Sequence, residues 1–168
     1  MELWDVYNEK REKTGKTIDR HSDDKLGKGE YHLVTEAIII NSDKKILLSK
    51  RAEFKQKFPL MWEFTGGSVK QGETTLEAIL RELKEELNIN LKKDDAKLYK
   101  TVKDDDVNDF KDIWIFYANI KLSELNFNDN EVIDAKWVDI KEIKNMIDKN
   151  EIVPTIDFSL NDLKQLLA

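Results

Sequence analysis

The sequence predicts a mixed α/β domain in which helices pack on a β-sheet. Strand-like runs stand on both sides of one strongly amphipathic helix, and two further helical segments close the chain. In 168 residues, 40% are apolar and 37% are charged, which is an ordinary globular composition rather than a disordered one. No repeat or Pro-rich linker divides the chain, so we expect an N-terminal extension over residues 1–30 and one domain over residues 31–168.

The strands are expected from short apolar runs that are bounded by turn residues. Leu3–Tyr7 and Lys16–Arg20 are interpreted as a hairpin around the polar segment Asn8–Gly15, which belongs to the extension. The remaining expected strands are His32–Ile40, Lys45–Lys50, a short piece leading to Gly66-Gly67, Ala96–Val102, Ile113–Ile120 and Ala135–Val138. A loose acidic group is interpreted as a solvated loop and consists of Asp104, Asp105, Asp106, Asp109 and Asp112.

One helix is predicted with particular clarity, because its apolar residues recur at three- and four-residue steps. These residues are Leu76, Ile79, Leu80, Leu83 and Leu87. Thr74 or Thr75 is expected to cap the start, and Asn88 tolerates the left-handed conformation that ends many helices. Ile140–Lys149 and Leu160–Leu167 are the two further helices, the latter following Pro154 and Ser159.

Composition excludes several classes of function. The chain contains no cysteine, which rules out disulfides, thiolate metal sites and cysteine nucleophiles. A net charge of −6 disfavours nucleic acid as a partner, because such binding needs dense positive charge. The longest strongly apolar run, Ala37–Ile40, is too short to span a bilayer, and no signal peptide is visible at the N-terminus. We therefore expect a cytoplasmic protein without a membrane partner.

Three carboxylates crowd one face of the clearest helix. Glu82, Glu85 and Glu86 stand at positions i, i+3 and i+4, where like charges repel each other. A hard divalent cation such as Mg²⁺ would relieve this repulsion, and a carbonyl in the Gly66-Gly67 turn could complete its ligands. The alternative interpretation is an ordinary surface helix that is rich in Glu and Lys.

The spacing around these carboxylates resembles the signature of a known family. Gly67 is followed after five residues by Glu73, which is followed after seven more by Arg81-Glu82-Leu83, Glu85-Glu86 and Asn88-Ile89. This run closely resembles the Nudix box and matches eight of its nine fixed positions. The exception is Asn88, where the family has glycine; because Asn tolerates a positive φ, we expect the helix end to survive.

The resemblance implies a Nudix fold, an α/β/α sandwich with a mixed sheet, in which the box forms a loop–helix–loop. Most members hydrolyse a nucleoside diphosphate linked to another group, by attack of water at phosphorus. Carried over to this chain, Glu82, Glu85 and Glu86 would bind Mg²⁺ or Mn²⁺ together with Gly66. Arg81 would hold carboxylates in place, and Glu73 would belong to the outer part of the site. We therefore expect a hydrolase of a small-molecule diphosphate.

The catalytic base and the substrate-binding residues are less determined. Within the box, Glu82 is the first choice as base and Glu86 is also expected to be catalytic. Glu131, and with less support Asp129, lies on a later loop where family members often place such a residue. Both are equally well interpreted as ordinary loop carboxylates.

Three residues outside the box are candidates to bind the substrate. Arg51 ends a strand and is expected to reach a phosphate, with a solvated strand end as the alternative. Trp62 and Phe64 precede the box and could stack on a base, although aromatic residues here also suit a core.

Two alternatives to the hydrolase are retained. The N-terminal region resembles type I isopentenyl diphosphate isomerases, but their cysteine is missing and Ser68 stands near the place of a metal-binding histidine. His21 and His32 are either remnants of such ligands or ordinary polar residues. A non-catalytic nucleotide-binding Nudix module is the other alternative, although such modules typically lose box glutamates. The hairpin has two interpretations, a homodimer interface or a cover over the pocket.

Overall fold

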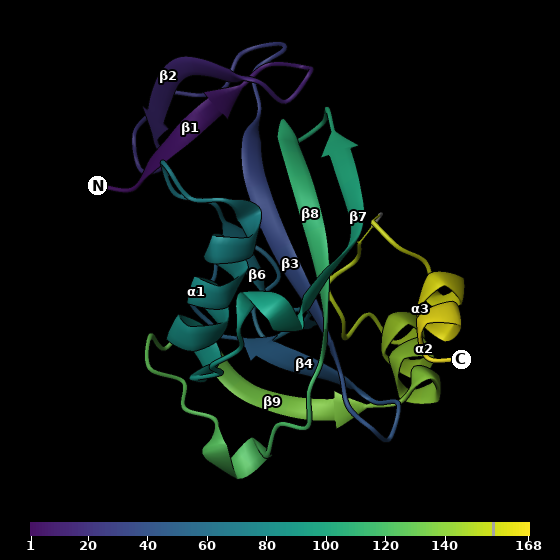
Figure 1. Ribbon diagram of the computed structural model, residues 1–168. Helices are drawn as coiled ribbons and strands as arrows, with labels where there is room; N and C mark the ends of the chain where they lie inside the picture. The colour runs from purple at the N-terminus through teal and green to yellow at the C-terminus, as the bar shows by residue number, and fades with distance from the viewer. Residues whose placement is uncertain (156) are drawn as a thin grey trace.

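A seven-stranded mixed sheet forms the centre of this computed structural model, which describes residues 1–155 and 157–168 (Figure 1). The main path of strands runs β5, β4, β3, β8, β7, while β6 pairs with β3 and β9 pairs with β4. Strands β3 and β8 pair in parallel, whereas β7 pairs with β8 in antiparallel orientation. The strands are β3 (His32–Ile40), β4 (Ile46–Arg51), β5 (Trp62–Glu63), β6 (Gly66–Ser68), β7 (Ala96–Asp104), β8 (Asp109–Tyr117) and β9 (Val132–Val138).

Three α-helices cover the two faces of the sheet. Helix α1 (Thr75–Leu87) lies on one face, and α2 (Ile140–Asp148) and α3 (Leu160–Leu166) lie on the other (Figure 1). Along β3 the apolar side chains alternate: Ile39 packs on the α1 side, and Ile38 packs on the side of α2 and α3. The predicted α/β/α sandwich is therefore confirmed. No helix of the described residues is long and apolar enough to cross a membrane.

Helix α1 begins and ends where its sequence predicts. Thr74 is the N-cap, and its hydroxyl accepts the backbone N–H of Glu77 while the Glu77 carboxylate accepts the N–H of Thr74. Asn88 ends the helix with a φ of 59°, in the left-handed conformation. The Asn that departs from the family pattern therefore preserves the helix end, as expected.

A separate hairpin of β1 (Leu3–Tyr7) and β2 (Lys13–Asp19) precedes the sheet. Its second strand starts three residues earlier than predicted, because the polar segment turns early: Asn8 Oδ1 accepts the backbone N–H groups of Lys10 and Glu12. Residues 13–15 are therefore in the strand rather than in the loop. Whether residues 1–30 form a unit of their own stays a prediction.

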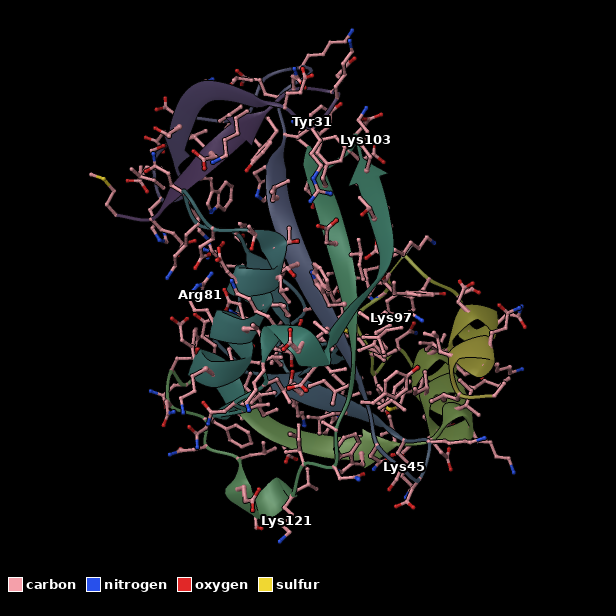
Figure 2. All side chains as sticks on the ribbon, in the orientation of Figure 1. Tyr31, Lys45, Arg81, Lys97, Lys103 and Lys121 are labelled. Carbon is pink, nitrogen blue, oxygen red and sulfur yellow. The ribbon has the colours of Figure 1, made fainter. Side chains whose placement is uncertain are left out.

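The hairpin is held to the sheet by aromatic and charged contacts. Tyr7 exchanges two backbone hydrogen bonds with Tyr31, and both rings belong to a buried cluster that includes Phe110. Lys103 lies over the ring of Tyr31, and the two side chains are seen together below the hairpin in Figure 2. On the other side, Trp4 stacks on His32 with the ring centroids 4.1 Å apart. These contacts hold the hairpin against the rest of the domain.

The acidic segment before β8 is only partly a solvated loop. Strand β8 begins at Asp109, four residues earlier than predicted, because residues 109–112 pair with the start of β3. Asp112 is 4% exposed and accepts hydrogen bonds from Arg11, Thr75 and Thr101, so its charge is compensated inside the protein. The prediction that Asp109 and Asp112 are solvated is therefore wrong. Both residues are buried.

Candidate active site

Two glycines bring the start of the box against its helix. A Cβ atom on Gly66 would lie 2.5 Å from the carbonyl oxygen of Thr35, and one on Gly67 would lie 2.4 Å from Glu82 Oε1. At Gly66 the clash is with backbone, so this position needs glycine, whereas at Gly67 the Glu82 side chain would have to move. Strand β6 thus runs close to α1 without side chains of its own at these two positions, and the Glu82 carboxylate occupies the space.

Arg81 joins three of the box glutamates. Its guanidinium group donates to both carboxylate oxygens of Glu73 at 2.7 and 3.0 Å, to Glu82 Oε1 at 2.8 Å and to Glu85 Oε2 at 3.2 Å. It also donates to the carbonyl oxygen of Ser68 at 3.1 Å. This is the carboxylate-holding arrangement that the resemblance implies, and it leaves Glu73 at the outer edge of the group.

Glu86 is the most unusual group of the site. The residue is 7% exposed, and its Oε2 atom is buried without a hydrogen-bond partner. Burial raises the pKa of this carboxyl well above its ordinary value, and the negative charges of Glu82 and Glu63 raise it further. Burial also raises the pKa of Glu82, although Arg81 opposes this effect. The site therefore holds more negative charge than its own cations compensate.

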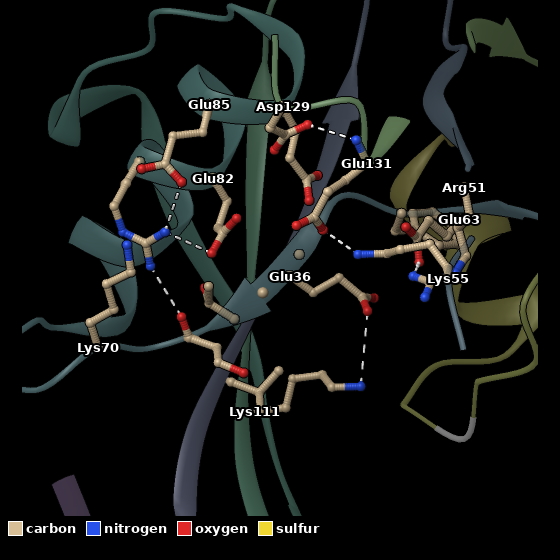
Figure 3. A pocket seen from close by; sticks show the side chains of 18 of the residues that line it. Glu36, Arg51, Lys55, Glu63, Lys70, Glu82, Glu85, Lys111, Asp129 and Glu131 are labelled. Carbon is tan, nitrogen blue, oxygen red and sulfur yellow. Dashed lines mark hydrogen bonds and ion pairs between the residues drawn. The ribbon is translucent and has the colours of Figure 1, made fainter. Parts of the chain in front are cut away.

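Two acidic residues and one lysine face the box from the sheet. Glu36 on β3 and Glu63 on β5 line the same cleft as Glu82 and Glu86. Burial raises the pKa of Glu36 to about 8, and its Oε1 atom has no hydrogen-bond partner. Lys111 on β8 lies 3.9 Å from Glu36 Oε2 and 2.6 Å from the Asp157 carboxylate, so it compensates only part of this charge (Figure 3).

The loop before β9 also lines the cleft. Glu131 pairs with Lys55, and its backbone N–H donates to Asp129 Oδ1 at 3.0 Å (Figure 3). Arg51 pairs with Glu63 at 2.8 Å and donates to the carbonyl oxygen of Lys57. Glu131, Asp129 and Arg51 thus stand at the cleft where the sequence interpretation needs them. Their chemical roles stay predictions.

The cleft that these groups enclose has a volume of about 330 Å³, and we call it the acidic cleft. Its lining includes Gly66, Gly67, Glu82, Glu85 and Glu86 from the box region. It also includes Glu2 and Arg20 of the hairpin. The interpretation of the hairpin as a cover over the pocket therefore has a structural basis, because two side chains at its ends border the cleft.

The two predicted aromatic contacts differ from expectation. Trp62 is not among the described residues that line the acidic cleft: strand neighbours alternate, so Glu63 faces the cleft while the Trp62 ring lies under Lys50 and Lys136. Phe64 does border the cleft, but it is buried and packs edge-on against Phe158 with the centroids 4.8 Å apart. The structure thus places Trp62 outside the lining of the acidic cleft and Phe64 in the core beside it, and their roles toward a substrate stay predictions.

The donor set suits a hard divalent cation. Carboxylate oxygens are the ligands that Mg²⁺ and Mn²⁺ prefer, and the orphaned Oε2 of Glu86 lies among further carboxylates. Among the described residues, no three such side chains already surround one point as metal ligands. Arg81 holds Glu82 and Glu85 by hydrogen bonds at 2.8 and 3.2 Å. The residues therefore fit a cation by chemistry and charge.

Comparison with known proteins decides the family. The NUDIX domain family matches residues 30–156, and a Nudix hydrolase of Listeria monocytogenes, lmo0368, is 37% identical over 99% of this chain and 95% of its own. The chain belongs to the Nudix family. A solved structure of DR0079 from Deinococcus radiodurans aligns with a TM-score of 0.74 at 23% identity and covers 99% of this chain and 97% of its own.

This membership confirms the recognised family, the Nudix fold and the enzyme class, which acts on diphosphate linkages. An isopentenyl-diphosphate Delta-isomerase from Salmonella heidelberg is also similar, at 27% identity over 82% of this chain and 78% of its own. The N-terminal likeness to isomerases therefore has a counterpart in a whole-domain comparison. His32 does not line the acidic cleft in the described structure; its ring is 9% exposed and packs on Trp4.

Sequence reasoning missed five groups that line the cleft from outside the box, namely Glu36, Glu63 and Lys111 on the sheet, Lys55 on a loop and Arg20 at the end of the hairpin. A signal existed for Glu36, since it is the one acidic residue in the strand run His32–Ile40. Glu63 carried a weaker signal, because it stands directly before the Phe64–Gly67 segment that enters the box. Lys111 and Arg20 carried none, because only tertiary packing brings them to the cleft.

Proposed function

We propose that this Nudix protein hydrolyses the diphosphate linkage of a nucleoside diphosphate-type or related small molecule, with Mg²⁺ or Mn²⁺ as cofactor. The observation that carries the proposal is Glu86, a buried carboxylate whose Oε2 atom is unpartnered among other carboxylates. Such an arrangement is costly unless a cation completes it. A surface helix that was merely rich in glutamate would leave these carboxylates in solvent.

Glu82, Glu85 and Glu86, with the Gly66 carbonyl group, are the proposed metal ligands. A divalent cation bound there would polarise phosphoryl oxygens and lower the pKa of the attacking water. Arg81 is a positioning residue, because its contacts fix Glu73 and Glu82. It would hold Glu82 within reach of the ligand position.

The proposed reaction is substitution at phosphorus by water. The water oxygen forms a new P–O bond, the bond from that phosphorus to the bridging oxygen breaks, and the leaving phosphate keeps the electron pair. Glu131 is the proposed general base, with Glu82 as the alternative within the box, and it would take the proton released by the water. Arg51, Lys55 and Lys111 line the cleft and would compensate the charge of the two phosphates.

A panel of diphosphates, assayed for phosphate and nucleotide release with Mg²⁺, tests the proposal. The panel holds nucleoside triphosphates, sugar nucleotides, dinucleotides and isopentenyl diphosphate, the last also assayed for double-bond migration. Glu86→Gln is expected to lose activity, whereas Glu124→Gln, at an exposed site in the short helix Leu122–Glu124, is the matched control and keeps it.

Three outcomes are distinguishable. Release that requires both the metal and Glu86 supports the hydrolase. Double-bond migration without release would establish the isomerase in its place, despite the missing cysteine. Tight binding of a panel member with neither reaction would overturn catalysis and favour a nucleotide-binding module.

A further inference from the structure

A second and larger cavity lies beside the acidic cleft, between α2, α3 and the segment that leads into β5. Its volume is about 640 Å³, which is within the range of small-molecule sites. The described residues that line it are mostly apolar, among them Phe58, Met61, Phe64, Ile147, Leu160 and Leu163. We call it the apolar cavity.

A third cavity adjoins both the apolar cavity and the acidic cleft. Its volume is about 440 Å³, and it shares Glu36, Glu63 and Lys111 with the acidic cleft and Phe58, Val153 and Pro154 with the apolar cavity. Phe64 lines all three spaces. A molecule held in the acidic cleft by its charged end would have the apolar cavity within reach of its other end, beyond Lys111 and Phe64.

The mouth of the apolar cavity exposes apolar side chains instead of burying them. Phe58 is 42% exposed and Ile147 is 45% exposed. Phe58 and its loop neighbour Leu60 also have φ values of 50° and 61°, a left-handed conformation that bulky residues rarely adopt. Strained loops that present apolar groups are characteristic of binding sites.

The lining distinguishes between kinds of ligand. Recognition of a nucleobase needs several hydrogen-bonding groups placed inside the pocket, and burying a base without them is unfavourable. Among the described residues, the polar lining consists of Lys144, Asp148, Asn150, Thr155 and Ser159, and Lys144 and Asp148 are exposed and already paired with each other. The aromatic and aliphatic groups form most of the wall, which suits an alkyl, prenyl or aryl group.

We propose that the substrate is a diphosphate ester of an apolar alcohol, with its diphosphate in the acidic cleft and its apolar group in the apolar cavity. This rests on the proposed hydrolase function. Water would attack one phosphorus, the bond to the bridging oxygen would break, and the products would be the apolar monophosphate and phosphate. The proton released by the water would pass to the general base.

A series of alkyl diphosphates with two, four, six, eight and ten carbons tests the proposal by phosphate release with Mg²⁺. The value of kcat/KM is expected to rise with chain length, by about fourfold for each methylene that becomes fully buried. It should level off once the cavity is filled. Nucleoside diphosphates are expected to be poorer substrates than the octyl compound.

Two substitutions test whether the dependence of kcat/KM on chain length arises in the apolar cavity. Ile147→Lys places an ammonium group at the mouth, and the octyl-to-ethyl ratio of kcat/KM should fall by roughly tenfold because the charge resists burial. Leu98→Lys is the matched control, since Leu98 on β7 is 48% exposed and lines none of the three spaces. Val153→Trp narrows the connection and should abolish the preference for long chains while leaving the ethyl compound a substrate.

Failure of this proposal is distinguishable from failure of the hydrolase. Hydrolysis of nucleoside diphosphates with no dependence on chain length would overturn the apolar site and leave the hydrolase intact. A dependence that Ile147→Lys leaves unchanged would overturn it as well. If no diphosphate is hydrolysed, calorimetry with octyl methylenebisphosphonate decides the question: binding that Ile147→Lys weakens and Leu98→Lys does not would support the site, and absence of binding would refute it.

Discussion

Replacing Gly67 by Ala changes the position of one carboxylate while leaving its chemistry unchanged. The new Cβ atom would lie 2.4 Å from Glu82 Oε1 and 2.8 Å from Glu82 Cγ. Ordinary contact begins near 3.4 Å, so the Glu82 side chain must move by about 1 Å or more. This movement also breaks the 2.8 Å hydrogen bond from Arg81.

A displacement of this size at a proposed metal ligand should lower kcat by about 10²-fold. The fold should survive, because the clash involves the end of a side chain and the φ of Gly67 is not positive. We expect the free energy of unfolding to change by about 1 kcal/mol or less. Phosphate release with Mg²⁺ and urea unfolding of the same preparations measure the two effects separately.

Two further glycine variants make the test specific. Gly66→Ala would clash with the backbone carbonyl of Thr35 at 2.5 Å, which cannot swing away, so it should cost about 1–3 kcal/mol of stability as well as activity. Gly27→Ala meets only the Glu30 carboxylate at 3.4 Å and is the neutral control. Wild-type kcat in Gly67→Ala would refute the reasoning, because Glu82 would then not need its observed position.

Three other predictions concern charge. The pKa of Glu36 is raised to about 8 in the folded protein, so this residue stabilises the folded state at low pH. The free energy of unfolding of the metal-free protein should therefore fall by roughly a few kcal/mol as the pH rises from about 4.5 to 8. Glu36→Gln should make the melting temperature depend less on pH over this range. Arg11→Ala leaves the buried Asp112 carboxylate without its guanidinium partner and should cost about 2–3 kcal/mol in urea unfolding, whereas Lys13→Ala, which breaks an exposed ion pair, should cost under about 1 kcal/mol. Glu131→Gln should lower kcat by about 10²-fold or more in the phosphate-release assay; an unchanged kcat would assign the base elsewhere.

The elements with a clear local pattern were predicted from the sequence. Helix α1 has both its apolar stripe and its caps in the local sequence, and the structure places its ends at Thr75 and Leu87. The start of β8 was missed for the opposite reason. Its first residues include Asp109 and Asp112, which resemble a loop, and the charge of Asp112 is compensated by Arg11, about a hundred residues earlier in the chain.

The same contrast holds for the site. Box residues such as Glu82 and Arg81 lie within one short segment, so their spacing alone predicts that they act together. Glu36 and Lys111 reach the cleft from two separate strands and Arg20 from the end of the hairpin, and no local spacing connects them. The position of Trp62 could not be predicted because either residue of the two-residue strand β5 could point to the cleft, and it is Glu63 that does so.

The two glycines of β6 explain how residues from both faces of the sheet line one cleft. Glu82 and Glu86 come from α1 on one face, whereas Glu36 follows the alternation of β3 toward the face of α2 and α3. A Cβ atom at Gly66 would meet the backbone of β3, and one at Gly67 would displace the Glu82 side chain. The two glycines thus allow carboxylates from two layers to line one charge-rich space.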